Sequence, residues 1–156
     1  MRKKLTIALA LVLGAAAVAF AAVAAGGTHS AGQRVRIDVK VSSTFVLRPM
    51  SKGRIQPDSG PMSFCCWRSW NVTRAGATIE VTNPRMTLAG SRGTLEIRER
   101  IEWVGLPDDW AVQTGTWKVV GGTGTYAGLS GRGRIASVTT PAGSVMVRLF
   151  GFLKPR

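Results

Sequence analysis

The sequence predicts an all-β protein, folded as a single antiparallel barrel or sandwich. Apolar and polar residues alternate with period two over several long segments, as in half-buried strands. Clusters of Gly, Pro, Asn and Asp separate these segments, as turns do. After the first 25 residues no stretch keeps the apolar spacing of an amphipathic helix. A closed barrel would also leave no exposed sheet edge, which helps a protein to avoid aggregation.

Residues 1–25 predict a signal peptide that is not part of this fold. The chain begins Met1-Arg-Lys-Lys4, continues as an uncharged Ala- and Leu-rich run, and reaches small residues at Ala22 and Ala24. The alternative is an uncleaved anchor helix, because roughly 20 apolar residues can span a bilayer. We expect a secreted or extracytoplasmic protein with a flexible lead-in at 26–32 and one domain at 33–156.

The first half of the domain contains three extended segments. Residues 34–47 predict one long half-buried strand, which a bend could interrupt. Its inward face would carry Val35, Ile37, Val39, Val41, Phe45 and Leu47. Residues 48–61 form a loop, 63–72 are aromatic and extended, and 78–82 form a short strand that ends at Asn83-Pro84.

The second half predicts four more strands, at 93–104, 111–120, 133–140 and 144–153. In the first of them Leu95, Ile97, Ile101 and Trp103 share one face with a single carboxylate, Glu99. Burial would raise the pKa of Glu99, as suits a general acid or a group that orients a ligand. The alternatives are an ion pair with Arg148, from the last strand, or contact with water at a barrel end.

The aromatic segment offers a second candidate site. Phe64, Trp67 and Trp70, with Arg68 among them, could line the mouth of a cavity and stack on a flat ligand. They could equally plug the core or a barrel end. The predicted ligand-binding residues are therefore Trp67, Trp70, Glu99 and Arg148, with Glu99 the one candidate for catalysis. We expect Trp110, which follows a loop, to be partly exposed.

The sequence offers little for metal, redox or nucleophilic chemistry. Cys65 and Cys66 are adjacent and would point to opposite faces of a strand, so a bond between them would need a strained turn. His29 is the single histidine and lies in the lead-in. No Cys and His cluster has ligand spacing, and no Ser-His-Asp set exists. We therefore expect no metal site and no cofactor.

The chain is strongly basic. It has 21 Lys and Arg against 8 Asp and Glu, a formal net charge of +13. An exported protein of this charge could bind anionic cell-surface polymers, or could have a basic surface without a dedicated partner. The basic residues are spread along the chain, and no nucleic-acid motif is present, so nucleic acid is not an expected partner.

A glycine-rich segment follows the strand at 111–120. Gly121, Gly124 and Ala127 have the three-residue spacing of a dinucleotide fingerprint. That fingerprint opens a helix inside a βαβ unit, whereas two strands follow here without an acidic ribose-binding residue. A compact structural turn anchored by Tyr126 and Leu129 explains the segment better. Its residues are Gly121, Gly122, Gly124, Tyr126, Gly128 and Gly131.

Residues 115–133, from Gly115-Thr-Trp-Lys-Val-Val through Gly131-Arg-Gly133, resemble the signature of the allene oxide cyclase and dirigent-like barrel superfamily, in particular bacterial exported members. Residues 93–100 are also similar. The resemblance implies an eight-stranded antiparallel barrel with a central cavity, cofactor-free cyclisation or steering of phenolic coupling in related proteins, and trimers. No catalytic residue of that superfamily can be placed on this chain.

These observations lead to one expected function and two alternatives. We expect an exported barrel that binds a small apolar or aromatic molecule in its interior. The first alternative is a cofactor-free isomerase or cyclase that uses Glu99. The second is a structural or wall-associated protein whose barrel is filled by its own side chains.

Overall fold

A computed structural model of the chain describes residues 32–40, 43–143 and 145–156. They form ten strands and one short 3₁₀ turn, η1 (Gly124–Tyr126). The strands are β1 (Gln33–Lys40), β2 (Thr44–Pro49), β3 (Asp58–Cys65), β4 (Ser69–Arg74), β5 (Ala77–Thr82), β6 (Arg85–Gly90), β7 (Gly93–Gly105), β8 (Ala111–Gly122), β9 (Leu129–Thr139) and β10 (Val145–Pro155). The expected signal peptide, His29 and all of the lead-in except Gly32 lie outside the described residues. Within the described residues no helix has the length and apolar character needed to cross a membrane.

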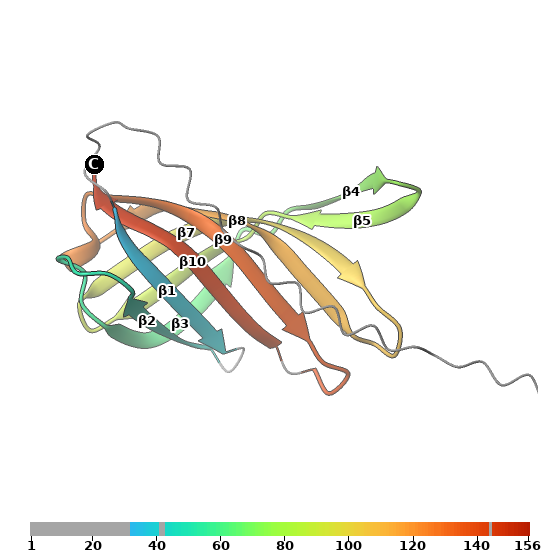
Figure 1. Ribbon diagram of the computed structural model, residues 1–156, viewed down its shortest axis with the longest axis horizontal. Coiled ribbons are helices and arrows are strands. Elements are labelled where there is room, and N and C mark those ends of the chain that lie inside the picture. Colours follow the sequence, from blue (N-terminus) through green and yellow to red (C-terminus); the bar gives the residue numbers. More distant parts are fainter. Residues whose placement is uncertain (1–31, 41–42, 144) are drawn as a thin grey trace, which may run out of the picture.

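Eight of the strands close into an antiparallel barrel, as predicted (Figure 1). The ring runs β7-β6-β3-β2-β1-β10-β9-β8 and closes where β8 pairs with β7. The two remaining strands, β4 and β5, form a hairpin that projects from one end of the barrel (Figure 1). The barrel therefore has two different ends, one of which carries this additional hairpin.

Strand β7 changes partner halfway along its length. Its first half pairs with β6, from Gly93 to Arg98, and residues 101–103 pair with β5 instead. Between the two, the amide of Glu99 donates a 3.0 Å hydrogen bond to the carbonyl of Pro84. Among the described strands no pairing joins β4 to β3, so beyond Glu99 the ring is open on one side. We call this end of the barrel the open half. It extends from Glu99 on β7 to the tip of the β4–β5 hairpin.

The inward faces of the eight barrel strands form the hydrophobic core. The inward residues predicted for 34–47 and 93–104 are buried wherever they are described, except Trp103, which is partly buried against the core. Val35, Ile37, Phe45, Leu95 and Ile97 are examples. Each inward position alternates with an outward polar one along its strand. The predicted alternation therefore gives the correct faces for β1, β2 and β7.

Residues 34–47 do not form one strand, and that prediction is wrong. They form the hairpin of β1 and β2, with Ser43 at its turn in the left-handed region (φ 69°). In the register of this hairpin Val39 lies opposite Phe45 and Ile37 opposite Leu47. Odd-numbered residues thus lie opposite odd-numbered residues, so the odd-numbered residues point inward on both strands. Val41 lies outside the described residues.

The segment at 63–72 is also interrupted. β3 ends at Cys65, and β4 begins at Ser69 after a short link. β6 was not expected, although Met86 and Leu88 alternate with polar or small residues in it, and both are fully buried.

Candidate functional site

The end of the barrel away from the hairpin is closed by a buried carboxylate, Asp58. The Tyr126 hydroxyl donates a 2.8 Å hydrogen bond to Oδ2 of Asp58. The Oδ1 atom accepts hydrogen bonds from the amides of Ser59 and Ser91 and from the Ser91 hydroxyl. Burial acts to raise the pKa of Asp58, but these hydrogen bonds outweigh it and hold the pKa below its ordinary value. Both carboxylate oxygens of Asp58 already accept hydrogen bonds within the protein, so Asp58 is not available to a ligand.

The middle of the glycine-rich segment, residues 123–128, forms the turn between β8 and β9 at this same end. The predicted turn was too long, because Gly121 and Gly122 belong to β8 and Gly131 belongs to β9. Gly124 and Gly128 have φ values of 55° and 69°, which glycine adopts without strain. The amides of Thr125, Tyr126 and Ala127 donate to the carbonyls of Arg92, Thr123 and Gly124 respectively. The N–H groups of these three residues are therefore not available to a phosphate.

A hollow of about 580 Å³ lies beside this turn, on the outside of the closed end. Its lining includes the turn residues and the basic side chains Lys52, Arg54 and Lys154. Glu99 does not line it, so this hollow is separate from the candidate site of the sequence analysis.

Further into the barrel, Trp117 occupies space left by inward glycines. Its indole nitrogen donates to the carbonyls of Arg134 and Phe150, both at 3.1 Å. A Cβ atom on Gly151 would lie 2.4 Å from Cζ2 of Trp117. This part of the interior is filled by the protein's own side chains.

Glu99 is buried on the inward face of β7, as expected. It is 1% exposed, and neither carboxyl oxygen has a hydrogen-bond partner among the described residues. Burial raises the pKa of Glu99 to about 8, because the charged form loses its hydration. At neutral pH the side chain is therefore a neutral carboxylic acid, which can donate a hydrogen bond.

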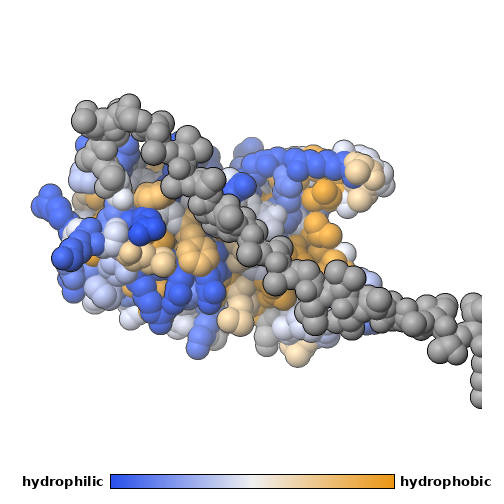
Figure 2. Space-filling view, viewed as in Figure 1, coloured by the Kyte–Doolittle hydropathy of each residue, from blue (hydrophilic) through white to orange (hydrophobic). Residues whose placement is uncertain are grey.

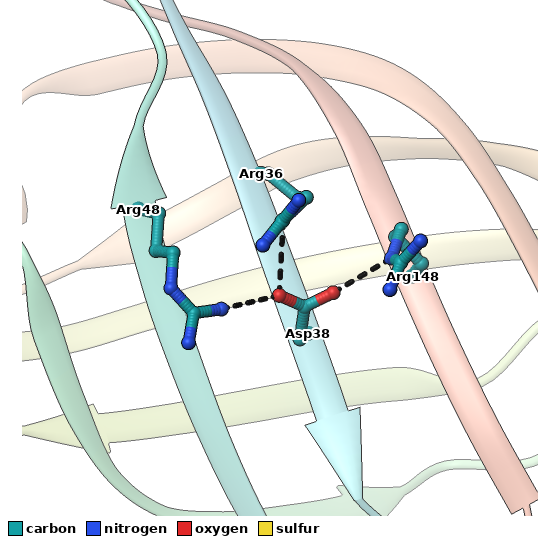
Figure 3. Close-up of polar contacts among 4 residues, drawn as sticks. All are labelled: Arg36, Asp38, Arg48 and Arg148. Carbon is teal, nitrogen blue, oxygen red and sulfur yellow. Dashed lines mark hydrogen bonds and ion pairs between the residues drawn. The ribbon is translucent and has the colours of Figure 1, made fainter.

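Arg148 does not pair with Glu99, so that alternative is wrong, and Arg148 does not face the interior as a ligand-binding residue there would. It is exposed on the outward face of β10, where its Nε atom donates to Oδ1 of Asp38 at 2.7 Å. Arg36 and Arg48 also contact Asp38, so three arginines surround one carboxylate (Figure 3). This cluster lies on the outer surface of the barrel, away from the interior.

Other inward polar groups lie in or beside the open half. Thr82 of β5 pairs with Ile101, which makes it a diagonal neighbour of Glu99 on the same face. Its hydroxyl is buried without a hydrogen-bond partner among the described residues, as are those of Ser137 and Thr139 on β9. Buried polar groups in native proteins nearly always have partners, so such a group calls for a specific explanation. Local sequence could not place Thr82 here, because its position depends on the pairing of β5 with β7.

The aromatic residues of 64–70 lie at the open half but do not share one face. Phe64 is 42% exposed and pairs with the inward-facing Met86, so it lies at the inner rim. Trp70 of β4 pairs with Val81 of β5, which pairs with Glu102 of β7. Paired residues share a face, so Trp70 lies on the outward face of the sheet, as Glu102 does. Trp67, in the link before β4, is 54% exposed. Phe64 therefore lies on the inward face, whereas Trp70 does not face the interior.

Trp103 is the second aromatic residue at the inner rim. It is only partly buried and packs against the core cluster, two positions beyond Ile101 on the same face of β7. Figure 2 shows hydrophobic side chains in the recess between the β4–β5 hairpin and the barrel. Trp110, in the loop after β7, is 42% exposed, in agreement with expectation.

Cys, His, Asp and Glu side chains form no group of three that could hold a metal ion within the part of the chain that the structure describes. Comparison with known proteins found no matching family model, no matching curated protein and no matching solved structure.

Proposed function

We propose that the protein binds a small, largely apolar or aromatic molecule in the open half of the barrel. The observation that carries this proposal is Glu99, a carboxyl group with 1% exposure and no hydrogen-bond partner among the described residues. A buried polar group without a partner is costly, by about 1–3 kcal/mol. A ligand oxygen that accepts a hydrogen bond from the carboxyl O–H of Glu99 would remove this cost.

The chemistry of the ligand follows from the groups around Glu99. Its neighbours along the inward face of β7 are Ile97 and Ile101, followed by Trp103. Thr82 adds a second unpaired hydroxyl on the same face. An apolar or aromatic body with one carbonyl, ether or epoxide oxygen satisfies both the apolar surface and the donor.

The ligand reaches Glu99 from the rim of the open half. Because Glu99 is almost fully covered, Phe64 and Trp103 must rotate aside when a ligand enters. Both lie at the rim, where Phe64 is exposed and Trp103 is partly buried against the core. Side-chain rotation of an exposed residue such as Phe64 takes picoseconds to nanoseconds. The closed end is not a route, since Asp58 and Tyr126 are buried and bonded to each other there.

The neutral aromatic dye Nile red, which has a carbonyl acceptor, provides the test. Its fluorescence should rise on binding, and its affinity should fall as pH rises through about 8, when Glu99 ionises. Glu99→Gln keeps a donor without a charge, so its affinity should not change over this range. Trp103→Ala should weaken binding about tenfold, or ~1.4 kcal/mol.

Phe150→Ser is the matched control, because Phe150 is exposed on the outer wall of the barrel. It should bind the dye as the wild type does. Loss of binding in Phe150→Ser, with no effect of pH or of Trp103→Ala, would show that the dye binds outside and would overturn the proposal.

A catalytic role for the same site is the first alternative. A protonated Glu99 could donate to an epoxide or carbonyl oxygen in a cofactor-free isomerisation or cyclisation. The resemblance to allene-oxide-cyclase-like barrels supports this alternative, as does the eight-stranded ring. With an unsaturated epoxide as substrate, Glu99→Gln should abolish turnover and retain affinity. Equal turnover in both proteins would exclude the role.

A second candidate function is attachment to an anionic cell-surface polymer, and the outer wall of the barrel favours it. Two rows of cross-strand neighbours on this wall are rich in basic residues. The first row is Arg34, Phe152, Arg132, Lys118 and Arg98, from β1 to β7. The second row is Arg48, Arg36, Phe150, Arg134, Thr116 and Arg100. We call these two rows the basic wall.

Several cations of the basic wall are free to bind an external anion. Asp38 pairs with Arg36 and Arg48, and Glu102 pairs with Arg100. Arg34, Arg98, Lys118, Arg132 and Arg134 form no ion pair with any described residue. The wall therefore keeps a strong positive field that attracts polyanions.

Dextran sulfate, a soluble polyanion, tests this second function. Its affinity should fall steeply with added salt, and the double substitution Arg132→Gln with Arg134→Gln should weaken it. The matched control is Lys52→Gln with Arg54→Gln, which removes the same charge from the loop at the closed end. Equal losses in the two double variants would mean that net charge, and not the wall, determines binding.

Export and oligomeric state are proposals as well. The basic and apolar leader supports secretion with cleavage near Ala24, which N-terminal sequencing of the secreted protein would test. The family resemblance supports a trimer. Native mass spectrometry of the purified protein should then show three chains, and a monomer would contradict it.

A further inference from the structure

The two cysteines of the chain lie together at the base of the β4–β5 hairpin. Their Sγ atoms are 2.6 Å apart, and both residues are exposed. Cys65 is the last residue of β3, and Cys66 is the first residue of the link that leads to β4. The pair therefore lies between the barrel and the hairpin.

The local backbone explains why adjacent side chains meet. Successive residues of a strand point to opposite faces, which would separate the two thiols. Cys66 instead adopts the left-handed conformation, with a φ of 59°. This conformation is uncommon for residues other than glycine. It turns the Cys66 side chain back toward Cys65, so the turn that a bond between them needs is already present.

We propose that Cys65 and Cys66 form a reversible redox site that closes to a disulfide between adjacent residues. The oxidant is a low-molecular-weight disulfide. The thiolate of one cysteine attacks it, forms a mixed disulfide and releases one thiol. The second cysteine attacks the mixed disulfide and releases the second thiol. Two protein thiols are thereby oxidised, and one external disulfide is reduced to two thiols.

The covalent geometry makes this bond labile. Adjacent Cα atoms lie about 3.8 Å apart, whereas disulfides usually join Cα atoms about 5.5–6 Å apart. The eight-membered ring is therefore strained, and strained, exposed disulfides are more easily reduced than structural ones. The site should respond to the redox conditions outside the cell and should not act as a permanent cross-link.

Closure of the ring would act on the hairpin. Near this link, the hairpin base is held by the amide of Asn83, which donates to the carbonyl of Arg68, and by the pairing of Ser69 with Thr82. A ring at Cys65 and Cys66 fixes the backbone immediately before these contacts. Oxidation should therefore slow the opening of the hairpin at its base.

The test uses the full secreted chain and oxidised glutathione. After reduction, N-ethylmaleimide should modify both cysteines. After oxidation, the intact mass should fall by two hydrogen atoms and the alkylating agent should add nothing. The change should map to the one tryptic peptide between Arg54 and Arg68, which contains both cysteines. Titration against reduced glutathione should restore both thiols.

Two other products would overturn the proposal. Stable glutathione adducts at Cys65 or Cys66, or dimers linked through them, would mean that the ring does not close. Cys65→Ser is the control, because it should form such an adduct at Cys66 and never the ring. These readouts involve no ligand, so the outcome is independent of the binding function proposed above.

Hydrogen exchange tests the effect on the hairpin. Amides at the hairpin base, at 69–71 and 80–82, should exchange more slowly in the oxidised than in the reduced protein, and Cys65→Ser should show no such change. If the ring forms but exchange stays the same, the coupling to the hairpin is wrong and only the redox site remains.

Discussion

The hydroxyl of Tyr126 donates a 2.8 Å hydrogen bond to Asp58, 68 residues earlier in the chain. Both residues are buried, and together they join the start of β3 to the turn between β8 and β9. The glycine-rich segment is thus tied to the opposite wall of the barrel through its single tyrosine. The segment therefore closes one end of the barrel, and the ligand site that we propose lies at the other end, in the open half.

Replacing Tyr126 by Phe should lower the free energy of unfolding by about 1–3 kcal/mol, because Asp58 Oδ2 loses its hydroxyl donor in a buried position. Urea denaturation at neutral pH measures the effect. Ser130→Ala is the control, since the Ser130 hydroxyl makes an exposed 3.3 Å contact with the Lys154 carbonyl. Equal effects of the two substitutions would contradict the role given to Tyr126.

Asp58 should make the fold sensitive to acid. Its pKa in the folded protein lies below the ordinary value of 3.8, so its stabilisation is present above that value. The stabilisation is lost as pH falls through the lower pKa of the folded state. Asp58→Asn should therefore differ from wild type less at pH 2 than at pH 6, as measured by thermal unfolding. Asp38→Asn serves for comparison, because the pKa of Asp38 is lowered as well.

Glu99 should have the opposite dependence on pH from Asp58, because it stabilises the fold less as pH rises. Its pKa rises from 4.5 to about 8 on folding, so the folded state holds its proton more tightly than the unfolded state does. Its contribution to stability is complete below pH 4.5 and is lost as pH rises to about 8, by up to ~1.4 kcal/mol per pH unit. Glu99→Gln should gain stability over wild type across this range, as urea denaturation would show. A constant difference at all pH values would contradict the burial of a neutral carboxyl.

Gly151 should be intolerant of any side chain. A Cβ atom there would lie 2.4 Å from Trp117 Cζ2 and 2.3 Å from the carbonyl oxygen of Arg132. Gly151→Ala should cost about 1–3 kcal/mol or more, because the core cannot accept the added volume. Gly105→Ala is the matched control in a strand, since a Cβ atom there meets nothing within 4 Å. Thermal unfolding should show a lower melting temperature for Gly151→Ala than for Gly105→Ala. Equal melting temperatures would contradict the packing of Trp117 on Gly151.

Alternation along the chain was sufficient to predict an all-β fold and the burial of Glu99. It left a barrel and a sandwich open, and the eight-stranded barrel followed from the family resemblance. Alternation failed at residues 34–47, because the register of the β1–β2 hairpin keeps odd-numbered residues inward on both strands. Arg148 could have been placed correctly, since Val147 and Leu149 on either side of it face inward. The same alternation therefore excludes Arg148 both as an inward ligand-binding residue and as the ion-pair partner of Glu99.

Other features of the site depend on long-range pairing, which no local pattern reveals. Trp70 faces outward because β4 is aligned through β5 with Glu102 of β7. Thr82 lies near Glu99 through the same pairing. The contact of Cys65 with Cys66 depends on a left-handed residue, which a sequence of two cysteines does not predict.

The proposed function requires that Glu99 is a neutral acid inside the barrel and can donate a hydrogen bond to a ligand. The most direct measurement is a pH titration of the Glu99 side-chain carboxyl by carbon-13 NMR, with the resonance assigned by its absence in Glu99→Gln. A buried neutral carboxyl should titrate with a midpoint at about 8. A midpoint near the ordinary value of 4.5 would show a hydrated or paired carboxylate and would contradict a neutral Glu99.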